Sequence, residues 1–133
     1  MILLDTNILA RHAVPDDPHK AVQCAKLLEN IASGRQQAVV TFLAIAELVW
    51  VLLGFYHLPK QQVIETVRKI LNTEKLEVTH RETLVRTLEL FDSHEIDFID
   101  AYHAAFMEEH RIHTIASYDT DFDQVAGITR KEP

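Results

Sequence analysis

Glycine and cysteine are scarce in this 133-residue sequence, which has three glycines and one cysteine. Gly34, Gly54 and Gly127 are too far apart to form a phosphate-cradling loop or a dinucleotide-binding fingerprint, so nucleotide-cofactor classes are excluded. A lone Cys24 excludes an intramolecular disulfide, and its position in the helical pattern AVQCAKLL predicts a small buried core residue rather than a nucleophile.

Positive charge is also in short supply, since 13 Lys and Arg stand against 20 Asp and Glu and the formal net charge is −7. Proteins that hold nucleic acid by broad neutralisation of its phosphates need clusters of Lys and Arg, so this mode of binding is disfavoured. A nuclease is still compatible with the charge, because divalent cations can bind between an acidic site and a phosphodiester.

The sequence has no apolar run long enough for a membrane span, because the longest, Thr41 to Phe55, is shorter than the roughly 20 residues required. The N-terminal MILLD reaches an acid too early for a signal peptide, so a cytoplasmic protein without membrane contact is expected. We find no internal repeat or linker, and the composition is that of a globular chain, which predicts a single domain over 1–133.

The hydrophobic pattern alternates between short apolar runs and amphipathic segments. Strands are expected over 1–5, 37–42, 76–80, 112–117 and 127–130, and helices over 18–34, 41–55, 59–72, 81–93 and 97–110. The acidic segment YDTDFD, 118–123, is expected to form a turn. Apolar strands separated by helices predict an α/β fold with a parallel sheet covered on both faces.

One carboxylate, Glu47, lies in the apolar segment TFLAIAELVWVLLGF without a nearby Lys or Arg in the sequence. An unpaired charge in a dry interior costs several kcal/mol or more, unless it shifts its pKa, pairs or binds a metal. Glu47 is therefore either a metal ligand at the edge of the core or a carboxylate at the rim of the helix that points into water.

Other acids fall where an α/β sheet usually has its ligand crevice, beyond the carboxyl ends of the strands. Asp5 ends the first expected strand, and Asp119 and Asp121 follow the strand at 112–117. Asp97 and Asp100 share one side of their helix at i and i+3. The opposite, core-facing side of that helix is expected to hold Phe98, Ala101, Tyr102 and Ala105.

Each acid also has a plain structural interpretation, because Asp5 and Asp97 can cap helices and YDTDFD can be a solvated turn. Four acids close together would repel one another strongly unless cations bound among them. Carboxylate ligands without cysteine suit Mg²⁺ or Mn²⁺ rather than structural zinc, and such an ion can activate water for phosphodiester hydrolysis.

The motifs LLDTNILAR, AIAELVWVL, DFIDAYHAA and SYDTDFD resemble, in order and separation, those of the PIN-domain ribonucleases, in particular the VapC-type toxins of toxin–antitoxin pairs. The resemblance spans nearly the whole chain and implies a PIN-like three-layer α/β/α fold with a central, mostly parallel sheet. It implies that Asp5, Glu47, Asp100 and Asp119 hold Mg²⁺ or Mn²⁺ as the catalytic quartet, with Asp121 as an auxiliary or alternative fourth acid.

Four further residues match less central positions of the family pattern. Asp97 matches a common acid, Thr6 and Asn7 are expected to orient Asp5 or a bound phosphate, and Ser117 matches the small hydroxyl before the last acids. His103 departs from the pattern, since relatives more often have an aliphatic residue there. It lies one turn after Asp100 and could reach the site, but a partly buried, hydrogen-bonded histidine is the favoured alternative.

The function implied by the resemblance is a metal-dependent endoribonuclease, the toxin of a pair, whose partner is a small antitoxin with a tail that blocks the acidic groove. A homodimer is also implied. The alternatives are a stand-alone RNA-processing nuclease with the same acids and a non-catalytic PIN-like module that binds RNA or protein. A receiver-type phosphoacceptor is disfavoured, because it needs an acidic pair after its first strand and a lysine after a late strand.

Overall fold

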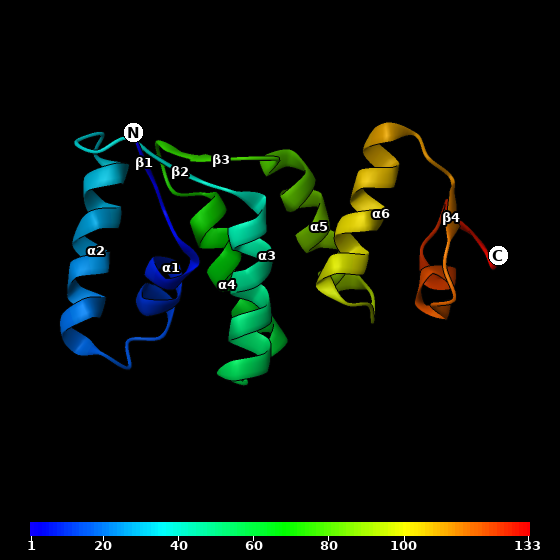
Figure 1. Cartoon of the computed structure of the whole chain (residues 1–133), viewed down its shortest axis with the longest axis horizontal. Coiled ribbons are helices and arrows are strands. Elements are labelled where there is room, and N and C mark those ends of the chain that lie inside the picture. The colour runs from blue at the N-terminus through cyan, green and yellow to red at the C-terminus, as the bar shows by residue number, and fades with distance from the viewer. The chain divides into compact units, whose positions relative to one another are not determined.

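The computed structural model describes residues 1–133, which form two units, Met1–Arg81 and Glu82–Pro133. Figure 1 shows the helices and strands of both. Each unit is an α/β arrangement with its own parallel sheet. The expectation of a single domain over 1–133 stays a prediction.

The first unit contains a three-stranded parallel sheet in the order β1-β2-β3. Its elements are β1 (Ile2–Leu3), α1 (Thr6–Ala13), α2 (Pro18–Ala32), β2 (Ala38–Val40), α3 (Phe42–Trp50), the π-helical turn η1 (Val51–Phe55), α4 (Lys60–Leu71) and β3 (Leu76–Val78). Asp17 caps α2 by accepting a hydrogen bond from the Lys20 backbone amide, and Pro18 occupies the first helical turn. Helix α1 packs between α2 and α3 (Figure 1).

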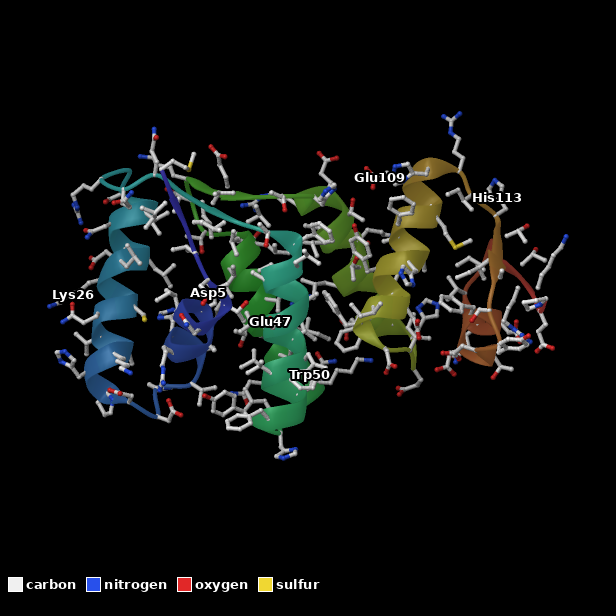
Figure 2. All side chains as sticks on the ribbon, viewed as in Figure 1. Asp5, Lys26, Glu47, Trp50, Glu109 and His113 are labelled. Atoms are coloured by element: carbon white, nitrogen blue, oxygen red, sulfur yellow. The ribbon has the colours of Figure 1, made fainter.

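Helix α3 has one buried and one exposed face. Ile45, Leu48 and Val49 are buried on the core side, together with Leu52 of the following π-helical turn. The opposite side carries Leu43, Glu47 and Trp50, the only tryptophan of the chain, all of them exposed. Figure 2 labels Glu47 and Trp50 on this helix. The spacing of 43, 47 and 50 places these three side chains along one stripe of the helix.

The second unit contains a two-stranded parallel sheet of β4 (Thr114–Ala116) and β5 (Thr129–Lys131). Its other elements are α5 (Arg81–Ser93), α6 (Phe98–His110) and the 3-10 helix η2 (Thr120–Gln124). Phe91 of α5 and Phe98 of α6 meet edge to face with ring centroids 5.6 Å apart. Phe98, Ala101 and Ala105 are buried and Tyr102 is half-buried, which confirms most of the expected core side of α6.

The α/β class with parallel strands is confirmed, and most expected elements are present within a few residues. Helix α1 was not expected, the strand expected at 127–130 begins two residues later as β5, and the predicted 41–55 helix turns π-helical after Trp50. Cys24 is buried, as expected. None of the helices combines the length and apolar character that crossing a membrane requires.

Candidate metal centre

Three carboxylates of the second unit come together at one point. Asp100 lies in the first turn of α6, Asp119 caps η2, and Asp121 lies in the first turn of η2. One carboxylate oxygen from each residue lies within 4.8 Å of the oxygens of the other two. The structure therefore brings together three of the acids that the sequence analysis selected.

Local hydrogen bonds build the part of this cluster that follows β4. The Asp119 backbone amide donates to Ser117 Oγ over 3.0 Å, and the Asp121 amide donates to Asp119 Oδ1 over 2.9 Å. Such side-chain to backbone bonds two residues apart are typical of Ser and Asp in turns. Ser117 thus orients the backbone at Asp119, and one Asp119 oxygen is engaged by the turn.

Asp100 is partly buried, and the pKa of its carboxyl is raised above the ordinary value. Desolvation is the largest cause, followed by the negative charges of Asp119 and Asp97. Asp97 is the exposed N-cap residue of α6, but its side chain makes no capping hydrogen bond. Mutual repulsion of carboxylates is the condition that a bound cation relieves.

Asp5 and Glu47 belong to the first unit, and Figure 2 labels both. Asp5 is exposed and caps α1, and its Oδ1 accepts a hydrogen bond of 2.9 Å from the Thr6 amide. The Thr6 hydroxyl donates to the Ala44 carbonyl of α3 over 3.4 Å, one helical turn before Glu47. Asp5 and Glu47 thus lie on packed neighbouring elements, and their participation in the cation site stays a prediction.

The question posed by Glu47 has a structural answer. Its side chain is exposed on the solvent side of α3, while the apolar residues around it in sequence supply the buried side. Because Glu47 is exposed, it carries no burial penalty, and its expected role as a metal ligand stays a prediction. The rim position leaves a ligand role open to it.

The auxiliary residues of the first unit differ in burial. Thr6 is buried, and its hydroxyl donates to the Ala44 carbonyl of α3, while its expected role in orienting Asp5 or a phosphate stays a prediction. Asn7 is exposed in the first turn of α1. Its expected role beside Asp5 stays a prediction. His103, expected to be partly buried, is exposed instead.

The donors of the cluster fit a hard divalent cation. All three are carboxylate oxygens, which suit Mg²⁺ or Mn²⁺ and not a thiolate-preferring metal. Mg²⁺ ligates oxygens at about 2.0–2.1 Å, so neighbouring ligand oxygens around one ion lie roughly 3–4 Å apart. The carboxylate oxygens of the three acids lie within 4.8 Å of one another, close enough to make them candidate ligands of one ion.

Arg130 of β5 is a residue that the sequence analysis missed. Its side chain contacts the segment that carries Asp119 and Asp121. The available signal was its position as a cation at the end of the expected strand 127–130, which follows the acidic turn after three residues. A strand position alone does not reveal which carboxylate a long side chain will reach.

The fold and site define an α/β protein with a carboxylate cluster suited to a divalent cation. A sequence model of one family, described as the PIN domain, matches residues 2–128. The chain belongs to the PIN domain family. The PIN-like α/β/α fold inferred from the sequence motifs is thereby confirmed.

A comparison with curated protein sequences found no match. Among solved structures, the chain is similar to the crystal structure of Mycobacterium tuberculosis VapC20, described as a sarcin-ricin loop cleaving toxin. The two share 17% sequence identity, the match covers 100% of both chains, and the TM-score is 0.42. The family assignment rests on the sequence model and not on this match.

Proposed function

We propose that this protein is a metal-dependent endoribonuclease. The observation that carries the proposal is the convergence of Asp100, Asp119 and Asp121 within 4.8 Å in a chain of the PIN domain family. The motif resemblance adds Asp5 and Glu47 as further candidate ligands. A bound Mg²⁺ or Mn²⁺ supplies activated water and stabilises the negative charge that develops on the phosphoryl group.

The residues of the chain have separate tasks in this proposal. Asp100 and Asp119 offer oxygens from a helix terminus and a turn, two supports that fix carboxylates in place. Asp121 is the auxiliary acid, and Ser117 orients the backbone at Asp119. No side chain forms a covalent bond with the substrate, because water is the nucleophile, and the hydrolysis leaves a phosphate on one RNA fragment and a hydroxyl on the other.

The experiment that tests this function is cleavage of a mixed cellular RNA pool by the purified protein in Mg²⁺, in Mn²⁺ and in EDTA. Asp119→Asn runs beside it, and Glu82→Gln of α5 serves as the control that removes one exposed charge. Cuts in the metal lanes that persist in the control and vanish in Asp119→Asn support the proposal. A folded wild-type protein that binds RNA without cutting it establishes the non-catalytic module instead.

We further propose that the biological role is that of a VapC-type toxin, silenced in the cytoplasm by a small antitoxin whose tail fills the acidic groove. The support is the motif resemblance from LLDTNILAR to SYDTDFD. Homodimerisation belongs to the same proposal. Expression in a bacterial host should arrest growth, Asp119→Asn should not, and a host that grows normally with active enzyme favours a stand-alone processing nuclease.

A further inference from the structure

The Arg130 guanidinium of β5 donates hydrogen bonds to four oxygen atoms. Its Nε and Nη2 donate to the two carboxylate oxygens of Asp123, over 3.0 and 3.3 Å. Its Nη1 donates to the Ser117 carbonyl over 3.0 Å and to the Glu132 carboxylate over 2.8 Å. The Arg130 side chain is only 14% exposed, so this is a well-fixed bidentate pair rather than a mobile surface bridge.

The contacts of Arg130 fall at both ends of the acidic segment. Ser117 precedes Asp119 and Asp123 follows Asp121, so the guanidinium joins the two flanks of the residues that offer the ligand oxygens. The backbone supports the same closure, because the Ser117 amide donates to the Lys131 carbonyl over 2.9 Å. Figure 1 shows the C-terminal segment, in red, beside β4.

A planar guanidinium is suited to this task because its donors have fixed directions. It can bind a carboxylate with one edge and a backbone carbonyl with another, which a lysine ammonium on a flexible stem cannot do with the same geometry. Loss of an outer group that orients metal ligands typically lowers metal affinity by about 10- to 100-fold.

We propose that Arg130 is a positioning residue that closes the segment Ser117–Asp123 and thereby holds the Asp119 and Asp121 carboxylates in the geometry that binds a divalent cation. The inference rests on the proposed function, whose cation site it deepens. According to this proposal, the positively charged Arg130 improves a binding site for a positively charged ion.

The effect of removing Arg130 on cation affinity distinguishes a positioning role from a purely electrostatic one. If Arg130 acted only through its charge, its removal would tighten cation binding, because a repelling neighbour would be lost. If it acts by holding the segment closed, its removal weakens binding. The two accounts therefore predict opposite directions for the same substitution.

The test is a titration of the full chain with Mn²⁺ in the absence of RNA, in which electron paramagnetic resonance counts the free ion. Arg130→Met should weaken Mn²⁺ binding by about 10- to 100-fold, the usual effect of losing an orienting partner. Arg130→Lys keeps the charge but loses the fork, and should weaken binding to a smaller but measurable degree. If Arg130→Met fails to fold, the Mn²⁺ affinity of Arg130→Lys decides the test.

Two controls accompany these variants. Lys131→Met removes the same charge from the next residue of β5, whose exposed side chain plays no part in the closure. Its binding should be unchanged or slightly tighter. Glu132→Ala removes the one side-chain contact of Arg130 that lies outside Ser117–Asp123, and should leave the affinity within about threefold, well below the effect expected for an orienting partner.

The outcomes distinguish the two levels of the proposal. Wild-type protein that binds Mn²⁺ while Arg130→Met and Arg130→Lys bind it equally or more tightly overturns the positioning role alone. Wild-type protein that binds no Mn²⁺ overturns the proposed cation site and the positioning role with it. Weaker binding in both arginine variants, with Lys131→Met unaffected, supports the inference.

Discussion

The two units of the molecule differ in the size of their apolar cores and in how their candidate acids are arranged. Of the largest fully buried side chains, all except Leu84 belong to Met1–Arg81, which also has the three-stranded sheet. The shorter unit Glu82–Pro133 has a smaller apolar core, yet it gathers three carboxylates within 4.8 Å. The first unit contributes its two candidate acids singly, Asp5 at a helix cap and Glu47 on a helix surface.

The difference shows how the cost of an acidic site is limited. Carboxylates that repel one another reduce stability, and in this chain they are grouped on a turn and a helix terminus, where backbone amides and water reduce that cost. The deeply buried aliphatic core lies in the other unit. Stability and cation chemistry are thus open to separate tests.

The largest expected effect is on cleavage. Asp119→Asn or Asp100→Asn should lower the rate of RNA cleavage by about 100- to 1,000-fold, because several kcal/mol of transition-state stabilisation by the cation are lost. Initial rates at saturating Mg²⁺ measure the effect, with circular dichroism as the check on folding. If a variant keeps more than about a tenth of the wild-type cleavage rate, the substituted acid is not a ligand of the catalytic cation.

The next largest effect concerns the contribution of the first unit's apolar core to the free energy of unfolding. Leu48→Ala should lower the free energy of unfolding by about 2–5 kcal/mol, because Leu48 is fully buried on the core side of α3. Leu43→Ala on the same helix should cost within about 0.5 kcal/mol, since Leu43 is 67% exposed. Urea denaturation provides both numbers, and equal losses would contradict the two-faced description of α3.

A third prediction sharpens the contrast between the units as cation ligands. Mn²⁺ affinity should fall by about tenfold or more in Asp100→Asn, equivalent to about 1.4 kcal/mol, and by less in Asp5→Asn or Glu47→Gln. The reason is that the three-carboxylate cluster lies wholly within the second unit. If Glu47→Gln weakens binding as much as Asp100→Asn does, the expected difference between these two acids is wrong.

The smallest effect concerns metal-free stability. The pKa of Asp100 is raised in the folded protein, so the native state binds a proton more tightly than the unfolded state does. In EDTA, wild-type stability should therefore rise as the pH falls through the raised pKa towards the ordinary one. Asp100→Asn should remove this rise and add no more than about 1 kcal/mol at neutral pH, a gain limited by the partial exposure of the group.

Thermal unfolding of the wild type and Asp100→Asn between pH 4 and pH 7 in EDTA checks this sign. If wild-type stability instead falls steadily as the pH is lowered over that range, at the same slope as in the variant, Asp100 does not carry the repulsion. Saturating Mg²⁺ should reverse the order of the two proteins at neutral pH, because only the wild type gains the full binding energy.

Much of the fold followed from local patterns in the sequence. The range of α5, Arg81–Ser93, was expected to the residue, because its apolar positions have a helical period and lie between clear boundaries. Helix α1 was missed because TNILARHA is short and follows an apolar strand directly. Asp5 was recognised as a possible cap, but the helix that it caps was not predicted.

The candidate site was predictable in part. Asp119 and Asp121 are close in sequence, and the end of a strand places them together, so local reasoning sufficed. Asp100 needed a long-range contact between α6 and η2, which the family motifs implied and spacing alone does not give. Arg130 escaped attention because its reach to Ser117 and Asp123 depends on the pairing of β4 with β5.

The single Trp50 turns the exposed side of α3 into an optical reporter. It is 73% exposed and follows Glu47 by three residues, so its indole lies one helical turn from a candidate ligand. Its fluorescence arises from one place on the molecule and needs no label to be assigned. An emission shift to shorter wavelength, or protection from a dissolved quencher, would show when RNA or a protein covers that stripe.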